Sequence, residues 1–338
     1  MTMSPNGSTE RPVSSIRVGT AIPAIGGRLL TGTQRREALI GIAEAGLDHV
    51  MFGDHISFHG GFGMDGLIQA AASLGCRPDL GVYVGLYLLP LRHPVPVARQ
   101  LSDLAELAPG KLTLGVGIGG EDRHEVAVCG VDPATRGKRM DESLTVLRNL
   151  IAGDRVTFHG DHFTVEDALV RPIPTKPAPL IVGGRSGAAL DRAARLGDGW
   201  LGIWISPTRF AAATAAIAAL AMEIGRETAA FSHGLNVWCG LAPNRDRARS
   251  AVADAMQATY RLPFDKFERY SPFGSAAEVT DFLGPYVEAG CTTFNLIPCG
   301  DNPDTVITMA SEIHRQLTGD ARRAAPHDAY APGGGLRG

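Results

Sequence analysis

The chain has 338 residues, of which 44% are hydrophobic and 20% are charged, and its formal net charge is −3 at pH 7. This composition is ordinary for a globular protein. The slight negative charge argues against nucleic acid as a partner, because a phosphate backbone binds to a basic surface. No stretch approaches the ~18 consecutive apolar residues of a membrane-spanning helix, so no membrane partner is expected.

Residues 1–15 are polar and lack the apolar segment of a secretory signal peptide. Five cysteines are spread along the chain without a CxxC pair, at positions 76, 129, 239, 291 and 299. Isolated thiols of this kind are typical core residues of proteins in a reducing compartment. Together these features predict a cytoplasmic protein.

Short apolar segments alternate with amphipathic segments along most of the chain. The expected strands are residues 16–22, 49–53, 80–89, 111–116, 180–182, 200–205, 235–241 and 293–297. The expected helices are residues 33–45, 64–74, 95–108, 140–152, 186–196, 207–224, 245–260, 275–289 and 303–317. Eight buried strands alternating with helices predict an α/β fold, a (β/α)8 TIM barrel, with an open doubly wound sheet as the alternative.

An insertion is expected before the fifth strand. Residues 156–165 predict a β-hairpin that turns at Gly160 and Asp161, and a proline-rich connector follows it. We expect one barrel domain over residues 16–317, with disordered tails at residues 1–15 and 318–338.

Several helix ends carry recognisable signals. Ser275 and Glu278 have the spacing of a capping box at a helix start. Gly46, Gly197 and Gly290 each separate a helix from a buried strand. We expect all three glycines at the C′ position that follows a helix.

The stretch from residue 180 to 205 predicts a strand, a turn, a helix and a second strand. The turn consists of Gly183, Gly184, Arg185, Ser186 and Gly187. Glycine lets the backbone approach a ligand closely, and the free N–H groups at a helix start attract an anion. Arg185 adds a positive charge. The turn therefore predicts a phosphate cradle, and the alternative is a tight turn that needs glycine for its geometry alone.

Asp54 and His55 follow the second expected strand, at the end where barrel enzymes place their catalytic residues. A histidine can donate a hydrogen bond to a redox ring, or exchange a proton with it, near neutral pH. The alternative is a buried pair that only fastens the loop. Arg92 follows the third strand and has the same two interpretations, site residue or salt-bridge anchor.

Residues 115–120 match the pattern G-x-G-x-x-G after the fourth strand. They do not open a helix directly, so we do not interpret them as a dinucleotide site. A glycine-floored pocket at the end of the strand fits better. Residues 121–125 (EDRHE) form a charge run typical of a solvated loop, although one of them can reach the pocket.

Two further patterns involve tryptophans and histidines. Trp200 and Trp204 share one strand face by alternation, either under the outer helices or at the barrel mouth. His159 and His162 flank the hairpin turn without carboxylate support, so no metal site is predicted.

Four segments together resemble the bacterial luciferase-like family of flavin- and deazaflavin-dependent oxidoreductases. They are GLDHVMFGDH, LPLRHPVPVARQLSDLAELAPGKLTLGVGIGG, RGKRMDESLTVLRNLIAG and PLIVGGRSGAALDRAARLGDGW. The resemblance covers about residues 16–317. It implies a (β/α)8 barrel with an insertion before strand five and with FMN or coenzyme F420 at its mouth. Asp54 and His55 favour F420.

The resemblance also implies roles for individual residues. His55 would act at the reacting face of the deazaflavin, and Asp54 would face the ring and orient His55. Gly85 and Leu86 would form a cis peptide behind the central ring. The other implied cofactor-binding residues are Gly117, Ile118 and Gly119 below the ring, and Gly183, Gly184, Arg185 and Ser186, with Gly187, at the phosphate.

The expected activity is hydride transfer between F420 and a small organic substrate. The alternatives are an FMN-dependent monooxygenase that uses reduced flavin and oxygen, and a non-catalytic family member that binds the cofactor or nothing. Some F420-dependent dehydrogenases have a Trp soon after the histidine and a Glu directly after the strand-four Gly-x-Gly. In this chain, Phe58 or no residue stands in the position of that Trp. The position of that Glu is taken by Gly120, with Glu121 after it. The identity of the substrate therefore stays open. The family resemblance implies a homodimer.

Overall fold

The computed structural model describes residues 16–23, 30–120 and 122–324. Eight parallel strands form a closed barrel, in which each strand pairs with the next and the last pairs with the first. They are β1 (Arg17–Ala21), β2 (His49–Phe52), β3 (Gly81–Tyr87), β4 (Leu112–Val116), β7 (Leu180–Gly183), β8 (Gly199–Ile203), β9 (Ser232–Leu241) and β11 (Thr293–Cys299). The predicted (β/α)8 barrel is confirmed, and the open-sheet alternative is wrong.

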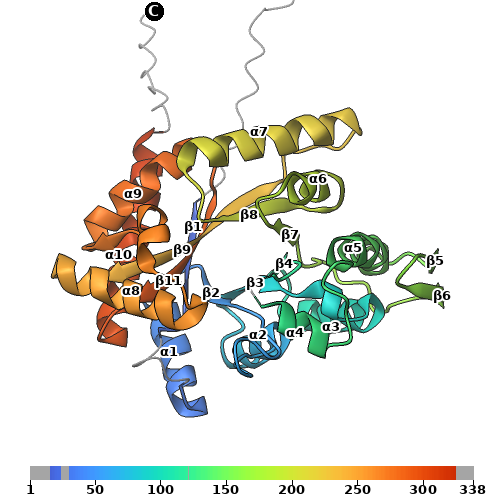
Figure 1. The fold of residues 1–338 in the computed structure, drawn as a ribbon, viewed down its shortest axis with the longest axis horizontal. Helices are drawn as coiled ribbons and strands as arrows, with labels where there is room; N and C mark the ends of the chain where they lie inside the picture. The colour runs from blue at the N-terminus through green and yellow to red at the C-terminus, as the bar shows by residue number, and fades with distance from the viewer. Residues whose placement is uncertain (1–15, 24–29, 121, 325–338) are drawn as a thin grey trace, which may run out of the picture.

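Helices cover the outside of this barrel (Figure 1). They are α1 (Gly32–Glu44), α2 (Gly66–Cys76), α3 (Pro94–Leu107), α5 (Arg136–Ala152), α6 (Gly187–Leu196), α7 (Pro207–Glu223), α8 (Arg245–Tyr260), α9 (Ala276–Glu288) and α10 (Pro303–Ala324). Because most strand residues are buried between the barrel interior and these helices, the strands appear in the sequence as nearly continuous apolar runs.

Short elements lie in several connections. They are α4 (Arg123–Val128), the 3₁₀ helices η1 (Leu89–Leu91), η2 (Phe264–Lys266) and η3 (Glu268–Tyr270), and the two-residue strand β10 (Phe273–Gly274), which pairs with β9. Two expected boundaries change. The expected loop over residues 117–139 contains α4 and the start of α5, and α10 continues past residue 317 into the segment expected as a tail. The other residues of both expected tails lie outside the described part of the chain.

The predicted hairpin is present between α5 and β7. β5 (Val156–His159) pairs antiparallel with β6 (Thr164–Ala168) and projects away from the barrel (Figure 1). The carboxylate of Glu142 on α5 accepts hydrogen bonds from the backbone N–H groups of Asp161, His162 and Phe163, at 2.9, 3.0 and 3.0 Å. This one side chain therefore fixes the turn of the insertion to the barrel.

The helix-end predictions hold in part. The Ser275–Glu278 capping box is present at the start of α9. Gly46 and Gly290 have φ of +76° and +89°, the left-handed conformation of a C′ glycine. The prediction is wrong for Gly197, whose φ is −95°. The left-handed residue of that connection is Gly199, where a side chain would collide with the backbone of Ser232.

No helix among the described residues combines the length and the apolar character needed to cross a membrane. The five cysteines are free thiols, and Cys239 and Cys291 are buried. Burial raises the pKa of both of these thiols.

Candidate active site at the carboxyl end of the barrel

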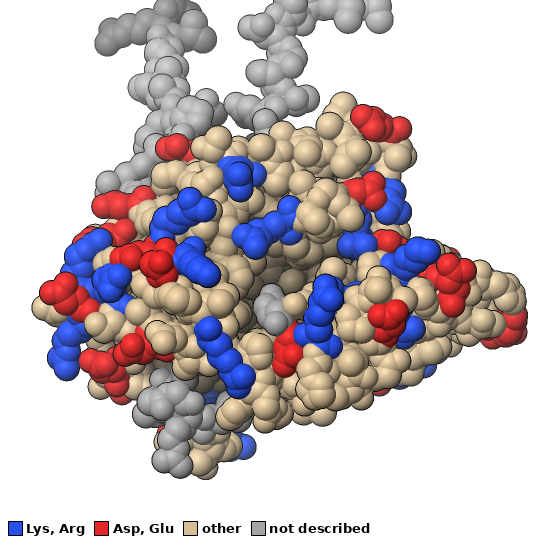
Figure 2. Space-filling view, viewed as in Figure 1, with Lys and Arg blue, Asp and Glu red and all other residues tan. Residues whose placement is uncertain are grey.

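The loops that follow β2, β4, β7 and β8 meet at one end of the barrel, because parallel strands end at the same edge. Figure 2 shows a hollow near the middle of the molecule, in the region framed by α4, α7 and α8 in Figure 1. The described residues predicted to form the site lie on these loops or at the strand ends.

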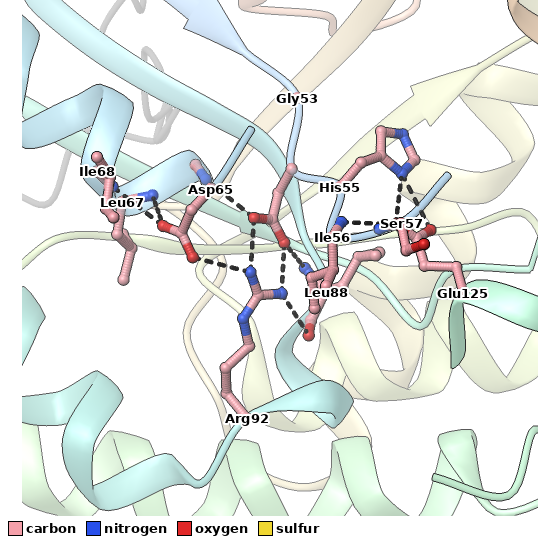
Figure 3. Close-up of polar contacts among 12 residues, drawn as sticks. Gly53, His55, Ile56, Ser57, Asp65, Leu67, Ile68, Leu88, Arg92 and Glu125 are labelled. Carbon is pink, nitrogen blue, oxygen red and sulfur yellow. Dashed lines mark hydrogen bonds and ion pairs between the residues drawn. The ribbon is translucent and has the colours of Figure 1, made fainter. Parts of the chain in front are cut away.

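His55 is held by a carboxylate from a distant loop. Its Nδ1 lies 3.1 Å from Oε2 and 3.3 Å from Oε1 of Glu125, on α4 (Figure 3). A carboxylate accepts hydrogen bonds, so Nδ1 carries the proton, and Nε2 has no partner among the residues described. The His55 side chain is 36% exposed, whereas Glu125 is 3% exposed. The histidine therefore offers a free nitrogen from a fixed position.

Glu125 also fastens the loop that carries His55. Its Oε1 accepts hydrogen bonds from the backbone N–H groups of Ile56 at 2.7 Å and Ser57 at 3.1 Å. The ring of Phe58 stacks on His55 with 4.2 Å between ring centroids. The sequence placed Glu125 in a charge run typical of a solvated loop, whereas the structure buries its carboxylate against the loop that carries His55.

Asp54 has a different role from the expected one. Its carboxylate accepts hydrogen bonds from the backbone N–H groups of Gly66 and Leu88, both at 2.9 Å, and from Arg92 at 2.6 and 2.8 Å. Figure 3 shows this network on the side away from the His55 ring. The prediction that Asp54 orients His55 is therefore wrong, because its oxygens are occupied and Glu125 does this instead.

Arg92 joins the network as an anchor of the loops. It also donates to Asp65 at 3.0 Å and lies over the ring of Tyr87 at 4.3 Å. Burial alone would lower the pKa of Arg92, but the charge of Asp54 and its hydrogen bonds raise it. The anchor interpretation of Arg92 and the loop-fastening interpretation of Asp54 both fit the structure.

Leu86 forms the floor of the mouth. The peptide bond between Gly85 and Leu86 is cis, as the resemblance implied. A Cβ added at Gly117 would lie 2.7 Å from Leu86 Cδ1, and one added at Gly183 would lie closer still. The space left by these two glycines is therefore filled by Leu86, so they shape the floor through that side chain. Ile118 and Gly119 follow in the same loop, and their contact with a cofactor stays a prediction.

A chain of hydrogen bonds runs through the barrel interior to the same peptide. His49 Nε2 lies 2.6 Å from Asn295 Oδ1, Asn295 Nδ2 donates to Asn236 Oδ1 at 2.8 Å, and Asn236 Nδ2 donates to the Gly85 carbonyl at 3.1 Å. Burial, followed by the charge of Arg17, lowers the pKa of His49 to about 4. Neutral His49 thus donates from Nε2. Sequence reasoning missed these residues, because single polar residues in apolar strands carry no motif.

The predicted phosphate loop lies beside a cavity. Ser186 is the N-cap of α6 and accepts a hydrogen bond from Ala189 N–H at 3.2 Å. The N–H groups of Gly187 and Ala188 have no acceptor among the residues described. The cavity has a volume of about 610 Å³, and its lining includes Arg185, Ser186 and Arg209. This arrangement has the free donors and positive charge that an anion needs.

The two tryptophans do not share a face. Trp200 is fully buried under α7 against Phe210, and its Nε1 donates to Gly184 O at 2.7 Å. Trp204 follows the end of β8 with a φ of +48°, and its ring packs on Phe267 with 4.7 Å between centroids. The prediction of one shared face is wrong, because strand alternation stops at Ile203.

The comparisons with known proteins agree with this architecture. The model of the luciferase-like monooxygenase family matches residues 26–289. The chain therefore belongs to the luciferase-like monooxygenase family.

Individual relatives are similar over parts of the chain. An uncharacterized protein of Mycobacterium tuberculosis is 42% identical over 113 residues, which are 33% of this chain and 38% of that protein. An F420-dependent glucose-6-phosphate dehydrogenase of Beutenbergia cavernae is 38% identical over 168 residues, 47% of this chain and 48% of the enzyme. The chain thus matches less than half the length of these relatives.

Among solved structures, an F420-dependent secondary alcohol dehydrogenase in complex with an F420–acetone adduct has a TM-score of 0.78 at 20% identity. The alignment covers 88% of this chain and 98% of that one. At this identity the likeness shows the fold.

Proposed function

We propose that this protein is an oxidoreductase that transfers a hydride between coenzyme F420 and a small organic substrate. The observation that carries the proposal is His55, whose Nδ1 is fixed by buried Glu125 while Nε2 is free at the carboxyl end of the barrel. The relative from B. cavernae and the solved alcohol dehydrogenase, both named as F420-dependent, support this choice of cofactor.

The residues at the mouth fit a ring with a phosphate-bearing side chain. Leu86 offers an apolar floor, and Gly117 and Gly183 leave it room to lie there. The free N–H groups of Gly187 and Ala188, with Arg185 beside them, fit the phosphate. Asp54 lies too deep to touch the ring, so we assign it to holding the loop that carries His55.

When bound, F420 supplies a two-electron acceptor or donor of hydride. His55 handles the proton of the same reaction. When an alcohol is oxidised, its O–H proton passes to Nε2 of His55 as the C–O bond becomes a carbonyl, and the reverse reaction returns that proton. Glu125 stabilises the doubly protonated ring through Nδ1, and it keeps Nε2 directed away from itself.

One binding experiment separates this function from the alternatives. Purified protein is titrated with F420 and, separately, with FMN, and binding is followed by fluorescence and absorbance. We expect saturable binding of F420. Binding of FMN instead would favour the monooxygenase, a class represented among the solved structures of this fold by a Baeyer–Villiger monooxygenase in complex with FMN. If the protein binds neither F420 nor FMN, the proposal is overturned.

A second experiment tests catalysis. The protein is screened for bleaching or recovery of F420 absorbance with small alcohols, aldehydes and ketones. We expect His55→Ala to lower turnover at least ~100-fold while F420 affinity stays within about twofold. His159→Ala, on the exposed hairpin, is the matched control and should leave both unchanged. Unchanged turnover in His55→Ala would leave a protein that binds the cofactor without using this histidine.

We further propose a cytoplasmic location and a homodimer. The free thiols support the first, and the family resemblance supports the second. Light scattering coupled to size-exclusion chromatography tests the dimer.

A further inference from the structure

A second cavity shares one lining residue, Arg209, with the cavity beside the phosphate loop. It has a volume of about 460 Å³ and lies between the start of α7 and α9. Arg209, in the first turn of α7, lines both this cavity and the one beside Ser186. Arg269 of η3 lines the second cavity. The two cavities thus meet at Arg209, and we call them together the path.

The arginines on this path lack carboxylate partners. In the part of the chain that the structure describes, the Arg209 side chain has no hydrogen bond or ion pair, and Arg269 only lies over the ring of Tyr270 at 4.6 Å. Arg185 donates only to the backbone oxygen of Trp204, at 3.2 Å. By contrast, three arginines on neighbouring α8 all have acidic partners: Arg245, Arg247 and Arg249.

The acidic lining of the path is limited to one residue. Asp281 on α9 is the single carboxylate among the described residues that line either cavity. The path is lined by three guanidinium groups and one carboxylate, so its net charge is positive. Figure 2 shows Lys and Arg side chains along the upper edge of the hollow, in the region where α7 begins in Figure 1. The N-terminus of α7, capped by Ser206, adds a partial positive charge.

The shape and the charge together indicate the ligand. A single phosphate needs only the first cavity, whereas Arg209 and Arg269 extend the positive charge into the second. Guanidinium groups bind carboxylates through paired hydrogen bonds. The path therefore fits an elongated ligand that carries carboxylates beyond its phosphate.

We propose that Arg209 and Arg269 bind the oligoglutamate chain that extends from the phosphate of F420. This inference rests on the proposed function. FMN ends at its phosphate and would leave the second cavity unused, so the path also favours F420 over FMN.

The test compares two forms of the coenzyme, one with its glutamates and one that ends at the phospholactyl group. Affinities are measured by fluorescence titration, without turnover. Arg209→Gln and Arg269→Gln are each expected to weaken binding of the glutamylated form about three- to fivefold and to leave the short form unchanged. The loss of affinity for the glutamylated form should be smaller at high salt, because salt screens the charges. Arg36→Gln, on exposed α1 and away from both cavities, is the matched control.

A variant that is expected to bind more tightly serves as a further test, because misfolding would not raise affinity. Asp281→Asn removes the opposing charge and should tighten binding of the glutamylated form about twofold, with no effect on the short form. Equal losses for both forms in the arginine variants would show that these residues act on the phosphate, and no loss would show that they bind nothing. Either result overturns this inference and leaves the proposed function intact. Failure of the unaltered protein to bind either form overturns both.

Discussion

The side-chain nitrogen of Asn236 in β9 lies 3.1 Å from the carbonyl oxygen of Gly85 in β3, on the opposite side of the barrel interior. Asn236→Leu would leave this carbonyl and the Asn295 amide unpaired in a dry core. We expect it to lower the free energy of unfolding by about 2–4 kcal/mol and to weaken F420 binding through movement of Leu86. Urea titration and fluorescence titration measure the two effects. A variant as stable as the parent protein would show that the chain of amides is unimportant.

Glu125→Gln keeps an oxygen for the N–H groups of Ile56 and Ser57 but removes the charge beside His55. We expect kcat to fall about 10- to 100-fold with little change in cofactor affinity. Glu125→Asp should recover part of the loss. The control is Glu142→Gln, which removes a carboxylate that also accepts backbone N–H groups but lies at the hairpin. If both Gln variants lose kcat equally, Glu125 acts only through stability.

Asp54→Asn removes a buried charge that faces Arg92, whose side chain is 16% exposed. Breaking one side of such a pair leaves an uncompensated charge, and Asp65 restores only part of the balance. We expect a loss of about 3 kcal/mol in the free energy of unfolding. Asp167→Asn breaks an exposed pair with Arg155 and should cost less than about 1 kcal/mol. Similar losses in the two variants would contradict the anchor role.

Gly183→Ala would push a methyl group into Leu86, whereas an alanine at Gly284 in α9 meets no atom within 4 Å. We expect the first variant to bind F420 at least ~10-fold more weakly, because the floor of the mouth must move. The second should bind normally. Fluorescence titration of the pair distinguishes the specific clash from the general effect of an added methyl group.

Buried His49 and partly buried His233 make stability depend on pH. Burial lowers the pKa of both His49 and His233 from 6.5 to about 4. Between these values the unfolded chain binds more protons than the folded one, so the free energy of unfolding falls as pH drops from 6.5 to 4. His49 alone accounts for about 3 kcal/mol. Urea unfolding at pH 7 and pH 5 should show the loss, and His49→Gln, which does not titrate, should show a smaller one.

The sequence predicted the barrel because each strand is a buried apolar run between two helices, a pattern visible without tertiary information. It also located the turn at Gly183–Ser186, since glycine and serine there serve local geometry. It could not assign Glu125, because a carboxylate in a charged segment is buried only by contact with backbone groups 69 residues away. Asn236 and Asn295 were missed for the same reason.

Predictions from short sequence patterns were wrong at two places where the backbone departs from regular strand or helix-end geometry. Strand alternation predicted one face for Trp200 and Trp204, but β8 ends before Trp204. Gly197 resembled Gly46 and Gly290 in sequence, yet the glycine with a positive φ in that connection is Gly199, the first residue of β8. A side chain at Gly199 would collide with the backbone of Ser232 on the adjacent strand β9, and this tertiary constraint is not visible in the neighbouring residues.

The segment after β4 holds the loop after β2 at two points, since Asp122 accepts a hydrogen bond from His59 N–H at 2.8 Å while Glu125 holds His55. In a chimera that exchanges only the β4–α5 segment with a family member, the histidine would therefore lose its support along with the loop. Anyone who grafts new specificity onto this barrel must transplant the two segments together.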